Sequence, residues 1–353
     1  MKIRNDIHLT VIVFLCCAAC VQEDHFGKSQ EKRILAFALE GQTGNTTINE
    51  ATKTISVTVG ANAPIAELKT TEIITSTFST ASPGVGIAQD FSVAVTYTVT
   101  AEDGSTADYS VIVSQEGSEP QLENSSFDSW YTTPKGYNEP GKDINSIWAT
   151  GNAGTITLGE ANVNPLLIRG EDRAAKLVTL DLGSVAGLIG QRMAAGSLFT
   201  GKFELDIANP LNSTKFGINF SAKPKKFSVK YAYSPGTPYL NKNGQVITKT
   251  DSCEIYVLLE NRDGPEPKRV ATGWFRSGEK KIDQFQTITI DLVYGPLGSN
   301  IPTYQKPANG LFASVNEKVT HLTVVFSSSY NGALFEGGTN STLVVNDFIL
   351  IYE

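Results

Sequence analysis

Short runs in which apolar and polar residues alternate make up much of the chain after residue 33. Thr54–Val59 alternates strictly, and Val93–Thr100 and Asp108–Val113 flank the dipeptide Asp103-Gly104. A period of two is typical of a half-buried strand, and Asp-Gly between two such runs predicts a hairpin. Residues 34–116 therefore predict a small antiparallel sandwich of the immunoglobulin-like kind.

A second series of strands follows a linker at residues 116–121, which is charged and contains Gly and Pro. Strands are predicted at residues 216–221, 227–233, 253–259, 287–293, 320–327 and 341–352, and one short helix at residues 184–195. The pattern favours an antiparallel jelly roll over a core of alternating strands and helices. We expect an all-β protein in which residues 117–353 form one large jelly-roll β-sandwich, similar to a galactose-binding domain.

The first apolar run, from Leu9 to Ala19, differs from the strands. It follows Lys2 and Arg4, and the chain becomes polar directly after Cys20. A span needs about 20 apolar residues, so this run is too short to cross a bilayer and is typical of a secretory signal. The small residues before Cys20 resemble the cleavage box of bacterial lipoproteins. We expect residues 1–19 to be removed and Cys20 to be lipidated; modification of Cys16 or Cys17, or secretion without lipid, are the alternatives.

A polar segment follows the predicted lipidation site. The acidic tetrapeptide at residues 21–24 (VQED) resembles the signal that sends lipoproteins of Bacteroidetes-type bacteria to the outer face of the outer membrane. Residues 20–33 are predicted to form a flexible tether between the lipid and the first sandwich. We therefore expect a protein on the cell surface that contacts the membrane through its lipid anchor only.

Charge and cysteine content argue against a nucleic-acid partner and against an intramolecular disulfide. Lys and Arg number 29 against 36 Asp and Glu, a net charge of −7. Nucleic-acid binding needs a basic surface, so a nucleic-acid partner is not expected. After removal of the signal and lipidation of Cys20, only Cys253 remains, so no disulfide can form within the mature chain.

Few residues are available for metal or nucleophilic chemistry. The only histidine in a predicted domain is His321, which excludes a multi-histidine zinc site, and no GxSxG sequence supports a serine triad. Glycoside hydrolysis needs only two carboxylates at about 5–10 Å. Candidates for such a pair are Asp128, Asp251, Glu254, Glu260, Asp263 and Glu336.

Several blocks of sequence in the second domain occur together and in order. They are FDSW (127–130), RGEDRAAKL (169–177), AAGSLFTGKF (194–203), KPKKFSVKYAYSPG (223–236), DSCEIYVLLENR (251–262) and SSSYNGALFEGGTNSTLVVNDFIL (327–350). Residues 122–353 thereby resemble the putative carbohydrate metabolism domain family of Bacteroidetes surface lipoproteins. The first sandwich resembles the small domains that follow the tether in many such lipoproteins. The resemblance implies a jelly roll that acts on or binds glycans.

Sugar binding requires aromatic rings for the apolar faces of a pyranose and polar side chains for its hydroxyls. Tyr233 is predicted to lie exposed at the end of its strand, and Trp148 lies among polar residues typical of a loop. Alternation places Tyr256 on the outward face of its strand, followed by Arg262. Trp130 is the fifth candidate; the alternative for each ring is a place in the core.

A calcium site is a further prediction. Residues 124–128 (NSSFD) resemble the opening of many carbohydrate-binding jelly rolls, in which an acid there and an Asp on the last strand often hold a structural calcium. Asp128 and Asp347 occupy those two places. Oxygen ligands suit a hard cation such as Ca²⁺, although Asp128 stands where Glu is usual.

These observations together predict a surface lipoprotein that binds poly- or oligosaccharide and performs no bond cleavage. Its partners would be carbohydrate and the outer-membrane proteins of glycan uptake. Two alternatives stay open at this point: a structural or adhesive protein that binds another protein, and a glycoside hydrolase with two carboxylates.

Overall fold

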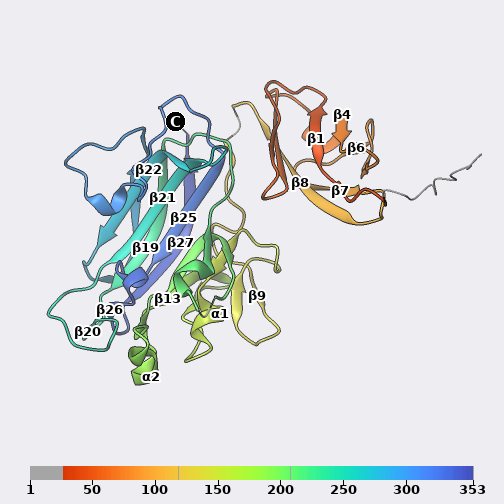
Figure 1. Ribbon diagram of the computed structural model, residues 1–353. Helices are drawn as coiled ribbons and strands as arrows, with labels where there is room; N and C mark the ends of the chain where they lie inside the picture. Colours follow the sequence, from red (N-terminus) through yellow and green to blue (C-terminus); the bar gives the residue numbers. More distant parts are fainter. Residues whose placement is uncertain (1–26, 118, 207, 353) are drawn as a thin grey trace, which may run out of the picture. The chain divides into compact units, whose positions relative to one another are not determined.

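The computed structural model describes residues 27–117, 119–206 and 208–352, and the chain divides into two compact units after Val113. Strands dominate both units, as Figure 1 shows, which confirms the prediction of an all-β protein. No helix within the described residues is long and apolar enough to cross a membrane.

The N-terminal unit is a sandwich of two antiparallel sheets. The five-stranded sheet has the order β2 (Thr47–Asn49), β3 (Thr54–Val59), β8 (Thr106–Gln115), β7 (Val95–Thr100) and β5 (Thr80–Ser82). The three-stranded sheet has the order β1 (Ile34–Leu39), β4 (Leu68–Thr75) and β6 (Ala88–Gln89). Apolar residues from both sheets fill the space between them, with Phe37 against Tyr97 edge to face at 5.0 Å.

The predicted hairpin joins β7 to β8. Thr100 pairs with Thr106 across the turn, and Gly104 has a φ of +86°. The Asp103 carboxylate accepts a hydrogen bond of 2.9 Å from the backbone N–H of Ser105. Glycine adopts this left-handed conformation more readily than any residue with a side chain, which explains the Asp-Gly signal.

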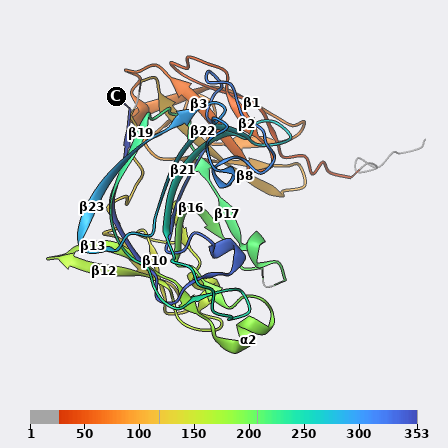
Figure 2. The ribbon, with the colours of Figure 1, turned by 90° about the vertical axis from the view of Figure 1, so that its left-hand side faces the viewer.

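The C-terminal unit is a larger two-sheet sandwich, and Figure 2 shows β19 and β23 in one layer with β16 and β21 in the other. The first sheet has eight strands. Six of them follow the order β11 (Trp148–Thr150), β16 (Ser197–Phe203), β25 (His321–Ser327), β21 (Cys253–Asn261), β22 (Lys268–Ser277) and β24 (Val293–Tyr294). The other two are β17 (Thr214–Phe216), which pairs with β16, and β18 (Ile218–Asn219), which pairs with β25. The second has the order β12 (Val163–Arg169), β13 (Asp172–Val178), β27 (Thr342–Ile351), β19 (Lys226–Ser234) and β23 (Lys281–Asp291).

Smaller elements close the ends of this sandwich. They are the pairs β9 (Trp130–Thr132) with β10 (Asn138–Pro140), β14 (Leu180–Asp181) with β15 (Met193–Ala194), and β20 (Tyr239–Leu240) with β26 (Gly337–Gly338), and the helices α1 (Asn152–Thr155) and α2 (Gly183–Leu188). Short 3₁₀ turns occur in the C-terminal unit at Pro210–Ser213, Thr303–Gln305 and Gly332–Leu334, and in the N-terminal unit at Ile65–Glu67.

Strand β21 separates the interior of this sandwich from an outer face. Its inward residues are all fully buried: Cys253, Ile255, Val257 and Leu259. They pack against inward residues of β19 and β27, such as Phe227 and Val345. The alternation of β21 therefore sends Glu254, Tyr256, Leu258 and Glu260 to the opposite side of the sheet.

Candidate functional site

Two of the predicted sugar-binding rings lie in the core. Trp148 is 2% exposed and Tyr233 is 0% exposed, so the expectation that they present free rings is wrong. A buried ring cannot stack on a sugar without unfolding its surroundings.

Trp148 and Tyr233 are buried because other segments of the chain pack against them. The Trp148 ring packs edge to face against Phe127 at 5.1 Å, and its indole N–H donates to the carbonyl of Glu123 at 2.8 Å. The Tyr233 hydroxyl donates to the carbonyl of Ser328 at 3.2 Å. Each polar group therefore has a partner inside the protein, which permits burial of the whole side chain.

Trp130 is half-buried at the edge of the same core. It lies on β9, in a two-stranded sheet separate from the eight-stranded one, and its indole N–H donates to the carbonyl of Phe127 at 2.7 Å. The structure does not place Trp130 in one sheet with the other predicted ring, Tyr256.

Tyr256 is partly exposed on the outer side of β21 and has an aromatic neighbour. It pairs across the strands with Trp274 of β22, and the two rings stack with centroids 4.1 Å apart and an angle of 13° between planes. The Tyr304 ring, 42% exposed, meets Trp274 edge to face at 5.7 Å. Three aromatic side chains from two strands and a loop thus lie together.

Arg276 contacts both Tyr304 and a fourth ring, that of Tyr330. It lies two residues after Trp274 on the same side of β22, and its guanidinium carbon is 3.6 Å from the centre of the Tyr304 ring and 4.4 Å from that of Tyr330. Cation–π contacts of this kind are worth about 0.5–2 kcal/mol each. We call Tyr256, Trp274, Arg276, Tyr304 and Tyr330 the aromatic face.

A buried carboxylate supports the aromatic face from below. Glu254, 7% exposed, accepts hydrogen bonds of 2.8 Å from the Trp274 indole N–H and from Nε of Arg276. Burial raises the pKa of Glu254, and the adjacent Arg276 guanidinium opposes that rise. The carboxylate fixes the orientation of both side chains, so the face is organised before any ligand arrives.

Arg262 lies at the other end of β21, among charged groups. Its Nη2 contacts Glu260 at 2.6 Å, and its Nη1 donates to the carbonyl of Phe216 at 2.9 Å. Glu260 also faces Arg269, and it pairs across the sheet with His321. The structure therefore places Arg262 directly after the end of β21 and outside the aromatic face.

Glu254 and Glu260, the two carboxylates on the outer side of β21, do not form a hydrolytic pair. Glu254 and Glu260 are six residues apart on one strand, which corresponds to about 20 Å. Glycosidases hold their two carboxylates at about 5–10 Å. Burial lowers the pKa of His321 to about 4, with a further contribution from Arg262, so its imidazole is neutral at pH 7.

The two predicted calcium ligands come from neighbouring segments but have other partners. The backbone N–H of Phe348 donates to the carbonyl of Ser125 at 2.9 Å, which joins the 124–128 loop to the last strand. Asp128 accepts a hydrogen bond of 2.8 Å from the backbone N–H of Arg173, and Asp347 binds Lys230 Nζ at 2.7 Å. The described residues contain no cluster of three or more His, Cys, Asp or Glu suited to a metal. Calcium stays an untested prediction.

Of the two cysteines expected in the mature chain, the structure describes only Cys253. Cys20 lies outside the described residues, so its lipidation stays a prediction. Cys253 is free and fully buried, and burial raises the pKa of its thiol to about 12. A thiol in this state is an inert part of the core.

Sequence reasoning missed most of the aromatic face. Of its five residues only Tyr256 is predicted from the sequence, because Trp274, Arg276, Tyr304 and Tyr330 carry no signal of their own. The alternation of Trp274 and Arg276 on β22 could have placed them on one side of a strand. Their meeting with Tyr304, which comes from a loop about 30 residues later, depends on tertiary structure alone.

Comparisons with known proteins agree with this architecture. Two solved structures are similar over most of their own length, and both are described as putative glycoside hydrolases. The one from Bacteroides thetaiotaomicron is 26% identical and covers 92% of this chain and 97% of its own, with a TM-score of 0.54. The one from Bacteroides vulgatus is 25% identical and covers 65% and 97%, with a TM-score of 0.51. No curated protein matches this chain.

Two family models match the sequence. Residues 34–113 match the N-terminal domain of surface glycan-binding proteins, described as "SGBP, N-terminal". Residues 97–351, most of the chain, match the model described as "Putative carbohydrate metabolism domain". The protein is thus related to carbohydrate metabolism domains over more than half of its length. It belongs to the putative carbohydrate metabolism domain family.

Proposed function

We propose that the C-terminal unit captures a poly- or oligosaccharide on the aromatic face. The observation that supports this most strongly is the stacked pair of Tyr256 and Trp274 beside the exposed ring of Tyr304. Such a group of rings on the outside of a sheet is unusual, since large aromatic side chains are mostly buried. Pyranose rings offer apolar C–H surfaces that pack on rings of this kind.

Polar groups beside the rings supply the directional part of recognition. The Arg276 guanidinium has five N–H donors, of which Nε and Nη2 contact Glu254. Its remaining donors and the hydroxyls of Tyr304 and Tyr330 are suited to hydroxyl oxygens of a sugar. Because Glu254 and the two tyrosine rings already hold Arg276, little side-chain entropy is lost when a ligand binds.

The remaining parts of the chain serve to place this site at the cell surface. In this proposal Cys20 carries the lipid, residues 20–33 are the tether, and the N-terminal unit is a spacer that holds the C-terminal unit away from the outer membrane. The match of residues 34–113 to a domain of surface glycan-binding proteins supports that role. The captured glycan would be passed to transporters and hydrolases of the same surface.

A polysaccharide array with the purified protein tests the proposal, followed by the same array with Trp274→Ala. We expect retention on at least one polysaccharide and a loss of about tenfold or more in affinity for the variant. Phe78→Ala, which removes a 72% exposed ring from the N-terminal unit, is the control. Binding to no glycan, with specific capture of a protein instead, would support the adhesive alternative.

Glycoside hydrolysis is the second candidate, favoured by the descriptions of the two similar solved structures. Among the described residues, burial raises the pKa of Glu139 to about 7, a value that suits general acid catalysis. Turnover of a polysaccharide that the array identifies, abolished by Glu139→Gln, would establish this function. Binding without turnover would leave capture as the function.

A further inference from the structure

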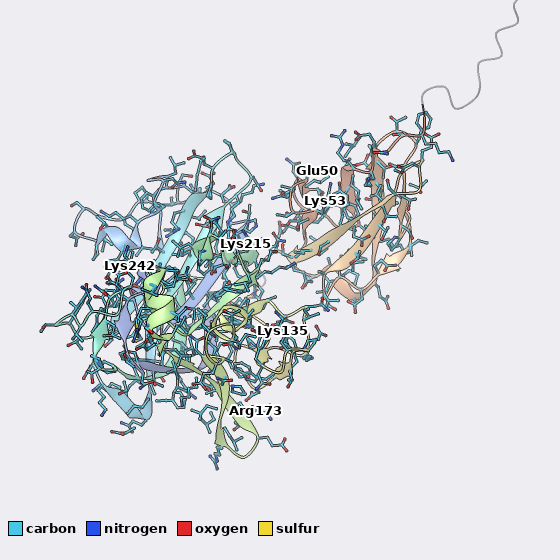
Figure 3. The ribbon with its side chains drawn as sticks, turned by 60° about the horizontal axis from the view of Figure 1, so that its bottom comes forward. Glu50, Lys53, Lys135, Arg173, Lys215 and Lys242 are labelled. Carbon is cyan, nitrogen blue, oxygen red and sulfur yellow. The ribbon has the colours of Figure 1, made fainter. Side chains whose placement is uncertain are left out.

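A pocket of about 330 Å³ lies in the C-terminal unit, away from the aromatic face. One wall is the turn between β9 and β10, with Lys135 and Tyr137, together with Asn138 at the start of β10. The other wall is the segment before β12, with Glu160, together with Asn164 near the start of β12. In the eight-stranded sheet, three strands (β16, β25 and β21) separate β11, which follows β10 in the sequence, from β22 of the aromatic face. Lys135 is labelled in Figure 3.

A fully buried asparagine joins the two walls. The Asn152 side-chain amide donates to the carbonyls of Asn138 at 3.0 Å and Val163 at 2.8 Å. Its carbonyl oxygen accepts hydrogen bonds from the backbone N–H groups of Asn162 at 3.0 Å and Val163 at 2.9 Å. One side chain thus holds both walls through four hydrogen bonds, so the pocket is built into the fold.

The lining has the chemistry of a site for one sugar residue. The Asn138 side-chain oxygen accepts a hydrogen bond from Thr132 at 3.0 Å, and the Asn164 amide donates to the carbonyl of Ala161 at 2.8 Å. These bonds orient both amides, and each amide keeps a further donor and acceptor for the hydroxyl groups of a sugar. Tyr137 is half-buried and contributes an aromatic ring and a hydroxyl. Among the described residues, neither Lys135 nor Glu160 has an ion-pair partner closer than 4 Å in the structure. The volume is near the lower limit for small-molecule pockets, about 300–1,000 Å³.

The shapes of the two sites favour different parts of a glycan. The aromatic face lies along a sheet and can accept the inside of a long chain, whereas the pocket has walls on two sides and fits a chain end. We propose that the pocket binds the terminal residue of a saccharide, as a second site on the same unit. This inference rests on the proposed function, because it assigns the same class of ligand.

Saturation-transfer NMR of the purified protein tests the pocket directly. The probes are glucose, galactose, mannose, N-acetylglucosamine and galacturonic acid at millimolar concentration. We expect at least one of them to bind to the wild type, with affinity reduced about tenfold in Tyr137→Ala and unchanged in Phe78→Ala, the control outside both sites. Asn164→Ala is the second pocket variant if Tyr137→Ala fails to fold, and Tyr137→Phe is expected to restore part of the binding.

The outcomes separate this inference from the proposed function. No signal from any of the five sugars, or equal signals in wild type and folded Tyr137→Ala, would overturn the pocket while array binding on the aromatic face could persist. Conversely, sugar binding that needs Tyr137 in a protein that retains no polysaccharide would overturn capture on the aromatic face and leave the pocket standing. Loss of monosaccharide binding in Tyr304→Ala alone would also overturn the inference.

Discussion

The interior of the C-terminal sandwich and its aromatic face use the same residue types in different ways. Trp148 in the interior packs against Phe127, Phe326 and Phe348, and a backbone carbonyl satisfies its N–H. On the aromatic face, Trp274 stacks on Tyr256 and donates to the carboxylate of Glu254.

The difference shows how to tell a structural ring from one available to a ligand. An interior ring has apolar neighbours on all sides, so the burial of its whole apolar surface contributes to the free energy of unfolding. A ring on the aromatic face touches charged groups that are themselves held in place, and part of it stays in water. The neighbours of an aromatic side chain are therefore more informative than its residue type.

Truncation of the interior ring should have the largest effect on stability. Trp148→Ala removes a fully packed indole and leaves a cavity, which costs about 3–5 kcal/mol. Urea unfolding monitored by circular dichroism measures the loss. If the unfolding midpoint hardly moves, Trp148 is not the core residue that its contacts indicate.

The second largest effect is the pH dependence of stability that a buried carboxyl group causes, and it differs between Glu139 in the interior and Glu254 beneath the aromatic face. Glu254 faces Arg276, whereas Glu139 accepts a hydrogen bond of 2.8 Å from Thr150 and has a pKa raised by burial from 4.5 to about 7. The folded state therefore binds more protons than the unfolded state between these values. Its stability relative to Glu139→Gln should fall as the pH rises from about 4.5 through 7, by up to about 3 kcal/mol.

Unfolding free energies of both proteins at pH 5 and pH 8 measure this difference. Subtraction of the variant removes the opposite contribution of His321, whose lowered pKa makes stability rise between about pH 4 and 6.5. A constant difference between wild type and Glu139→Gln across this range would contradict the raised pKa.

Removal of an exposed ring from the aromatic face should change binding and leave stability almost intact. Tyr304→Ala is expected to weaken polysaccharide affinity about tenfold, or about 1.4 kcal/mol, with a stability loss below about 1 kcal/mol. Affinity electrophoresis and thermal unfolding measure the two quantities. An equal loss of affinity in Phe78→Ala would show that the effect is not specific to the aromatic face.

The smallest effect concerns the exposed pair of Asp347 and Lys230. Asp347→Asn should cost less than about 1 kcal/mol, since partly exposed ion pairs contribute little. The cost should be the same with calcium and with EDTA if Lys230 is the only cation at this carboxylate. A cost seen only with calcium would instead establish the calcium site predicted at Asp128 and Asp347.

Local patterns in the sequence were sufficient for the fold class and for one strand of the site. The alternation of residues 253–259 correctly assigns Cys253 to the core and Tyr256 to the outer side, because one side of that strand is buried and the other is not. Strand β22 escaped prediction because Arg269–Gly273 are buried in succession, which removes the alternation.

The depth of an individual ring is not a local property. Trp148 is surrounded in sequence by Asn145, Ser146 and Asn152, yet its spatial neighbours are aromatic residues far along the chain. The aromatic face likewise depends on the register that pairs Tyr256 with Trp274 and on a distant loop that brings Tyr304. Neither pairing is encoded in a short stretch of sequence.

Tryptophan fluorescence during titration with a polysaccharide retained on the array tests the central claim most directly. Trp274 is the only tryptophan of the aromatic face, and the other two, Trp130 and Trp148, lie at or in the core. We expect the emission of the wild type to shift on binding and the shift to disappear in Trp274→Phe, while Trp130→Phe retains it. Binding with an unchanged shift in Trp274→Phe would show that the glycan is held elsewhere and would contradict the account.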